Sequence, residues 1–132
     1  MVGLADFLLA AEAVLGIDAE RIARATRISL AESALAAPFA SFEGNDLYTD
    51  PIQRAAILAS RIVRNHPLPD GNRRVALLLM DMYLEEQGFC LRAMPSEIDR
   101  ILSSLVAGRL SEADFTLWLR ARAERHGESR QR

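Results

Sequence analysis

The centre of the chain reads Asn65-His66-Pro67-Leu68-Pro69-Asp70-Gly71-Asn72-Arg73-Arg74, and an apolar run follows over residues 75–80. Two prolines and a glycine this close together end any helix that precedes them. The composition predicts that a new helix begins at Asn72 and continues to Gly88. Because the early turns of this helix are apolar all round, we expect it to be the buried central helix of the fold.

Helical periodicity also extends over most of the remaining chain. Asp50 before Pro51 predicts a helix start, since aspartate caps the first turn and proline has no N–H to leave unpaired. No run alternates long enough to form the core of a sheet, and the end of the chain from Arg120 is expected to be solvated and frayed. We predict an all-α, compact, single-domain helical bundle over residues 1–126 and a disordered tail over 127–132. Besides the central helix, helices are expected over residues 4–15, from about 18, and over 28–36, 51–64, 95–107 and from 112. Ser111, with Asp114 three positions on, is the expected cap of the last of these helices.

The composition restricts the classes of function. A length of 132 residues suits one domain, and a formal net charge of -2 with a pI near 5.7 argues against direct binding of nucleic acid. Cys90 is the single cysteine, so it closes no intrachain disulfide and indicates neither a metal cluster nor an oxidising compartment. No stretch is long and apolar enough to predict a membrane span, and we expect a soluble, cytoplasmic protein.

The two arginines at the start of the expected central helix are unusual. Arg73 and Arg74 fall in its first turn, where the helix dipole disfavours a cation by about 0.3 to 1 kcal/mol. A bound anion reverses that effect, because first-turn N–H groups have no partner within the helix and Gly71 places no Cβ in the way of a ligand. The segment therefore predicts a phosphate-binding site.

Two further residues add chemistry to this site. Asp70 is a hard oxygen ligand suited to the Mg²⁺ that accompanies nucleotide phosphates. His66 is the group nearest to the site that titrates near neutral pH, which makes it a candidate general base. Each residue alone also fits an ordinary capped helix with polar surface side chains. Together, before a helix too apolar to lie at the surface, they favour an active site.

The segment resembles the signature of the Fic/Doc family, which runs His, any residue, Phe, any residue, Asp or Glu, Gly or Ala, Asn, a variable position and Arg. The resemblance extends over about residues 28–91, including residues 33–36, 47–48 and 54–56. It implies the Fic/Doc helical fold over residues 1–126. The residues in register with the signature are His66, Asp70, Gly71, Asn72 and Arg74.

The resemblance also implies roles for these residues. His66 would take a proton from a protein hydroxyl, Asp70 would bind Mg²⁺, and Asn72 with the backbone at Gly71 would form an anion hole. Arg73 and Arg74 would hold the phosphates of ATP. The catalytic residues so implied are His66, Asp70 and Arg74, and the nucleotide-binding residues are Gly71, Asn72, Arg73 and Arg74.

Three departures from the signature bear on the branch of the family. Leu68 stands where the family has the phenylalanine that anchors the loop in the core. Arg73 stands where Doc proteins have lysine and Fic transferases have glycine, and arginine replaces lysine throughout this chain. Leu77 stands where the transferases carry a second arginine. The last two departures favour the Doc branch.

We therefore expect a toxin of a toxin-antitoxin pair that transfers the γ-phosphoryl group of ATP to a translation factor, as Doc-like proteins do on elongation factor Tu. The alternatives are AMP transfer and a degenerate Fic-like module that binds a nucleotide or a partner without turnover.

Control of the activity is expected to come from another chain. Fic proteins that restrain themselves carry Ser or Thr followed four residues later by Glu, and no such pair occurs in this sequence. The expected partner is a Phd-like antitoxin whose disordered C-terminal segment folds on binding. The loop over residues 38–50 stands where the family has the flap that aligns the target segment, and a plain connector is its alternative interpretation.

Overall fold

The computed structural model describes residues 2–127. Of the tail expected over residues 127–132, residues 128–132 lie outside the described residues. Within the described range the chain is mostly helical, which confirms the expected all-α class. In chain order the elements are α1 (Leu4–Leu15), α2 (Ala19–Ala25), α3 (Ile28–Ala36), the 3-10 helix η1 (Ala37–Phe39), β1 (Ser41–Phe42), β2 (Asn45–Asp46), α4 (Pro51–Asn65), α5 (Asn72–Glu86), β3 (Phe89–Leu91), α6 (Pro95–Val106), α7 (Glu112–Arg122) and β4 (Ala123–Arg125).

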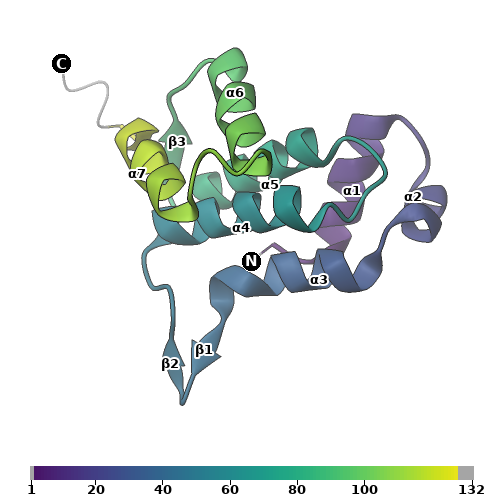
Figure 1. Ribbon diagram of the computed structural model, residues 1–132, viewed down its shortest axis with the longest axis horizontal. Coiled ribbons are helices and arrows are strands. Elements are labelled where there is room, and N and C mark those ends of the chain that lie inside the picture. Colours follow the sequence, from purple (N-terminus) through teal and green to yellow (C-terminus); the bar gives the residue numbers. More distant parts are fainter. Residues whose placement is uncertain (1, 128–132) are drawn as a thin grey trace.

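The helices α4 and α5 form the centre of the molecule (Figure 1). They pack against each other, and α4 also contacts α3, α6 and α7 while α5 contacts α1 and α6. α4 buries side chains over most of its circumference, from Ile52 to Val63. α5 buries the face that carries Val75 and Leu79 and leaves Leu78 on the outside. The buried helix expected after the loop thus shares the core with the helix before the loop.

The caps that the sequence indicated are present. The Asp50 carboxylate accepts the N–H of Ile52 at 3.1 Å, and Pro51 opens α4. Ser111 caps α7 in the same way, because its hydroxyl oxygen accepts the N–H of Asp114 at 3.1 Å. These local bonds fix where α4 and α7 begin, and α4 leads directly to the loop that carries His66.

The end of the described chain differs from the expectation. α7 continues to Arg122, and β4 then pairs antiparallel with β3, with Cys90 opposite Glu124. The Arg125 guanidinium lies 5.0 Å from the centre of the Phe89 ring. The expectation that the chain is frayed from Arg120 onward is therefore wrong for residues 120–125. A strand of three residues is too short to show alternation in the sequence, and its partner lies more than thirty residues away.

The loop over residues 38–50 contains the second small hairpin, β1 with β2. Figure 1 shows it projecting from the end of the molecule where α4 begins. His66 follows the other end of α4, which at 15 residues is about 22 Å long. The side chains of Phe42 and Leu47 in this loop are largely exposed. The hairpin has the form of a flap, and its role in aligning a target segment stays a prediction.

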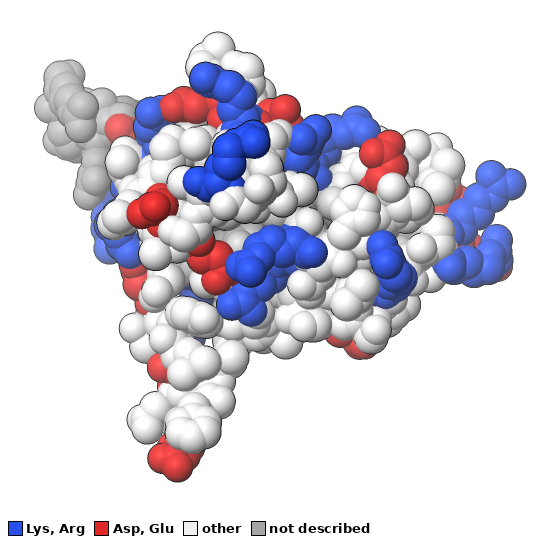
Figure 2. Space-filling model, viewed as in Figure 1, with Lys and Arg blue, Asp and Glu red and all other residues white. Residues whose placement is uncertain are grey.

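The surface carries mixed charge. On the face shown in Figure 2, arginines lie in separate groups with uncharged and acidic side chains between them. Among the described residues of this face, no continuous cationic surface of the kind used for nucleic acid is formed. No helix within residues 2–127 has both the length and the apolar composition needed to cross a bilayer.

Candidate active site

The residue expected to act as the base directly follows α4. His66 has φ 52° and ψ 56°, the left-handed region that residues other than glycine seldom adopt. Its N–H donates to the carbonyl of Ile62 at 3.1 Å and closes the last turn of the helix. Arg27, just before α3, donates from its guanidinium to the carbonyl of His66 (2.8 Å) and from its backbone N–H to that of Pro67 (2.9 Å). A second segment therefore holds this conformation in place.

The loop after His66 is anchored by one apolar side chain and one amide. Leu68 is 0% exposed and belongs to the main core. The buried Asn72 side chain accepts the N–H of Leu68 at 3.0 Å and donates to the carbonyl of Leu68 at 2.9 Å. The Asn72 amide thus bonds both the N–H and the carbonyl of Leu68, as the backbone of a neighbouring β-strand would. Because these bonds commit the side chain of Asn72 to the loop, its backbone N–H is the group left for an anion.

The same amide determines how the imidazole lies. The two bonds to Leu68 fix which side of the Asn72 amide carries oxygen, and the remaining Nδ2 hydrogen points to Nδ1 of His66 at 3.1 Å. Nδ1 then accepts, so the neutral ring carries its hydrogen on Nε2. A base that acts through Nε2 needs the opposite tautomer. His66 therefore has to release Asn72 before Nε2 can take a proton.

Gly71 directly precedes α5 and has the left-handed conformation, with φ 80°. A Cβ at this position would come within 3.1 Å of both Val14 and Leu15 in α1. The absence of a Cβ at Gly71 therefore allows α1 to pack closely against this residue. The sequence had suggested instead that it makes space for a ligand. Within the described residues no side chain caps the first turn of α5, so its N–H groups remain available to an anion.

The first arginine of the pair reaches across to α6. Arg73 Nη1 donates to the hydroxyl of Ser103, and its Nε lies 3.4 Å from a carboxylate oxygen of Asp99. Both side chains of the ion pair are about half exposed, at 48% and 59%, so their attraction is weakened by water. The contact nevertheless fixes a direction for the long Arg73 side chain, over the space between the start of α5 and α6.

This space is a cavity of about 410 Å³. Its size falls within the range usual for sites that bind small molecules. Asp70 and Arg74 lie on its wall with exposed side chains. The six residues singled out from the sequence all line the cavity, together with three that were not: His66, Asp70, Gly71, Asn72, Arg73 and Arg74, with Val63, Asp99 and Val106.

Comparison with known proteins matches residues 6–84, more than half of the chain, to the model of the Fic/DOC family. The chain belongs to the Fic/DOC family. Protein adenylyltransferase fic-1 of Caenorhabditis elegans is 43% identical over 51 residues, which are 39% of this chain and 10% of that protein. The namesake from Caenorhabditis briggsae is 44% identical over 48 residues, 36% of this chain and 10% of that protein. The chain thus matches about a tenth of the length of these curated relatives.

The family signature allows the burial of Leu68 to be interpreted. This residue occupies the place of the phenylalanine in the Fic/DOC signature, and it is fully enclosed in the core. Leucine buries less apolar area than phenylalanine, but the two bonds from Asn72 to the Leu68 backbone add to its hold on the loop. The smaller anchor is therefore compatible with an ordered Fic/DOC loop.

Sequence reasoning missed the residues that support this Fic/DOC site from other elements. Arg27 precedes the loop by about forty positions, and Asp99 and Ser103 follow it by about thirty. Nothing in their local sequence distinguishes them from ordinary polar residues of a helix or its end. Their pairing with the loop is a consequence of how α3 and α6 pack around α4 and α5.

Proposed function

We propose that this chain transfers the γ-phosphoryl group of ATP to a hydroxyl of a protein, and that it acts as the toxin of a toxin-antitoxin pair. The observation that carries the proposal is the position of Arg73 on the cavity wall, directed to Asp99 and Ser103. In the Fic transferases a glycine at this position leaves an open pocket, where the β and γ phosphates settle and present the α-phosphorus. A long cationic side chain there favours the opposite orientation of ATP, with its γ-phosphoryl group nearest His66.

The other residues fit this transfer. His66 removes the proton of the acceptor hydroxyl after the imidazole turns away from Asn72. Arg74 makes no ion pair among the described residues, so its guanidinium is available to the charge on the transferred group. The first-turn N–H groups of α5 add further donors to the phosphates. The phosphorus–oxygen bond to ADP breaks as the bond to the acceptor oxygen forms, and the proton stays on His66.

The site also fits a magnesium ion that arrives with ATP. Asp70 is an exposed carboxylate on the cavity wall, and Mg²⁺ is commonly held by one or two carboxylates together with substrate phosphates. When bound, the ion supplies charge that balances the phosphates. Asp70→Ala is therefore expected to weaken binding of Mg²⁺-ATP more than binding of ATP in the presence of a chelator.

AMP transfer is the second candidate. The observation that favours it is the identity of 43% and 44% to proteins named adenylyltransferases, over segments that cover more than a third of this chain. The two reactions share the base, the anion site and the acceptor. They differ in which phosphorus atom of ATP faces His66, and we propose that the side chain at position 73 determines this orientation.

The expected substrate is a translation factor, elongation factor Tu first among them, and the expected inhibitor is a Phd-like antitoxin with a disordered C-terminal segment. The proposal is tested by expressing the chain alone, with a matched pair of histidine variants. Wild type and His126→Ala should arrest growth, whereas His66→Ala should not. Equal arrest by all three at matched expression would mean that the chain acts as a binding module without turnover.

A further inference from the structure

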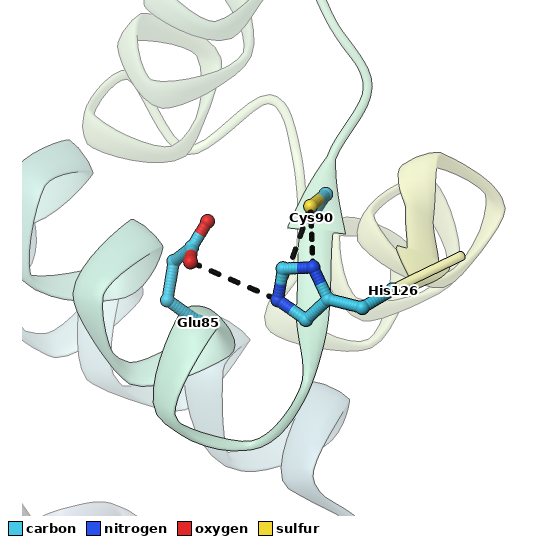
Figure 3. Close-up of side chains that lie close together, drawn as sticks. All are labelled: Glu85, Cys90 and His126. Atoms are coloured by element: carbon cyan, nitrogen blue, oxygen red, sulfur yellow. Dashed lines mark hydrogen bonds and ion pairs between the residues drawn. The ribbon is translucent and has the colours of Figure 1, made fainter. Parts of the chain in front are cut away.

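Away from the active site, three side chains of different chemistry converge at the far end of α5. Figure 3 shows the imidazole of His126 between the thiol of Cys90 and the carboxylate of Glu85. The Cys90 sulfur lies 3.2 Å from Nδ1 and 4.0 Å from Nε2, and a Glu85 oxygen lies 3.7 Å from Nε2. One atom from each residue can be chosen such that all three lie within 4.8 Å of one another.

The backbone holds these three residues in place. Glu85 belongs to the last turn of α5, and Cys90 belongs to β3, which follows after a tight turn. The N–H of His126 donates to the carbonyl of Gly88 at 3.0 Å, just beyond the pairing of β4 with β3. The side chains therefore meet because hydrogen-bonded backbone segments bring their Cα atoms together, and not through chance contact of long surface chains.

The contacts among the three groups are long or poorly aligned. A sulfur atom in line with the Nδ1 lone pair would lie much farther from Nε2, on the other side of the ring, than the 4.0 Å observed. The sulfur of Cys90 therefore lies out of line with the Nδ1 lone pair of His126. The 3.7 Å between Glu85 and His126 also exceeds the length of a hydrogen bond. Sulfur, nitrogen and oxygen atoms that can bind a metal ion thus lie close together.

Two carboxylates of α5 and two arginines lie near the cluster. Asp81 lies one helical turn before Glu85, and burial, with the added charge of Glu85, raises the pKa of its carboxyl group. Arg125 lies over the ring of Phe89, and Arg92 pairs with Glu124. A cation bound at Glu85 would relieve the repulsion between the two carboxylates on α5.

We propose that Glu85, Cys90 and His126 form a binding site for Zn²⁺. Thiolate, imidazole and carboxylate are the three protein ligands of zinc, whereas Mg²⁺ and Ca²⁺ prefer oxygen alone. Zinc with sulfur at about 2.3 Å and nitrogen or oxygen at about 2.0 Å places its ligands roughly 3.3 to 3.5 Å apart, which small side-chain rotations reach from the present separations. The Cys90 thiol releases its proton to solvent on binding, and water completes the fourth position.

Bound zinc would tie β4 to the end of α5 and so fasten the last described strand to the central helix. The site is independent of the proposed transfer reaction, because Glu85 lies thirteen residues along α5 from Asn72, about 20 Å by the rise of a helix. The metal-binding partners of Cys90 were not predicted from the sequence, because Glu85 and His126 meet it only through the turn after α5 and the pairing of β3 with β4.

The test uses the whole chain without an affinity tag, titrated with Co²⁺ as a coloured substitute for Zn²⁺. Wild type should bind one ion per chain, with a thiolate-to-cobalt absorption band that Zn²⁺ then removes. Cys90→Ser should lose that band. Loss of a residue that only supports a metal ligand typically weakens metal binding by about 10- to 100-fold. His126→Ala and Glu85→Gln remove ligands themselves, so each should weaken Zn²⁺ binding, measured by calorimetry, by more than that.

His66→Ala is the matched control, because it removes the other histidine of the chain and leaves the cluster intact. It should keep both the cobalt band and the wild-type affinity. Zn²⁺ should also raise the thermal unfolding midpoint of wild type and His66→Ala, but not of Cys90→Ser. An absence of Zn²⁺ binding up to millimolar concentration, or equal binding by wild type and Cys90→Ser, would overturn the site.

Discussion

At the scale of single residues, the loop is held by the side chains of Asn72 and Arg27. Asn72 uses both amide hydrogens and its oxygen within the segment, on the Leu68 backbone and on His66. Arg27 secures the carbonyls of His66 and Pro67 from outside. The backbone of His66 is therefore held by its neighbours, and its own exposed side chain adds little to the fold.

Because other residues hold the loop, replacing the side chain of His66 should affect the reaction rate and not the stability of the fold. Replacing a general base typically lowers the rate by about 10² to 10⁴, with nucleotide binding largely kept. His66→Ala should therefore abolish most transfer while its urea unfolding curve and its ATP affinity stay close to those of wild type. A matched His126→Ala variant should retain the rate. Transfer by His66→Ala at more than about a tenth of the wild-type rate would argue against the assigned base.

Leu68 predicts the opposite pattern. Truncating a fully buried leucine typically costs about 2 to 5 kcal/mol, so Leu68→Ala should strongly lower the free energy of unfolding. Leu78→Ala on α5 removes the same atoms from a side chain that is 45% exposed, and should cost about 1 kcal/mol. Urea denaturation of both variants measures the difference. Equal costs would mean that the loop is not anchored through the core.

At the scale of elements, a partly buried carboxylate joins α4 and α7. Glu112, in the first turn of α7, accepts from Ser60 at 2.8 Å and from Arg61 at 2.6 Å and 3.2 Å, and lies 3.2 Å from Arg64. Burial alone would raise the pKa of this carboxyl group, but the hydrogen bonds from Arg61 and Ser60 hold the pKa below its ordinary value.

The sign of this shift predicts a loss of stability in acid. A carboxylate whose pKa is lower in the folded than in the unfolded chain stabilises the fold above the unfolded pKa, and the contribution disappears as the pH falls through the folded pKa. Glu112→Gln should cost about 1 to 3 kcal/mol at neutral pH. Unfolding of the variant should also vary less with pH below about 5 than that of wild type. Parallel pH profiles for both chains would contradict this assignment.

The sequence predicted the elements well where the signal is local. The caps at Asp50 and Ser111 and the break around the prolines are properties of neighbouring residues, and each appears where expected. β4 and the contact of Arg73 with α6 were missed, because they depend on partners about thirty residues away. The reason for Gly71 was also misjudged, since α1 approaches this glycine from a distant part of the chain.

At the scale of the whole molecule, every residue that matches the signature lines one cavity, and α6 forms the opposite wall of this cavity. α6 contributes Asp99 and Ser103, which direct Arg73 across the cavity. The central claim is that this arrangement orients ATP for phosphoryl transfer. If so, Arg73→Gly should open the phosphate pocket and allow some AMP transfer, whereas Arg73→Lys should preserve phosphoryl transfer through similar charge and reach.

The most direct measurement is the intact mass of elongation factor Tu after incubation with the chain, ATP and Mg²⁺, with His66→Ala as the control reaction. Phosphoryl transfer predicts an added mass of about 80 Da in the wild-type reaction and none with His66→Ala. An added mass of about 329 Da, that of an adenylyl group, would contradict the assignment and establish AMP transfer instead.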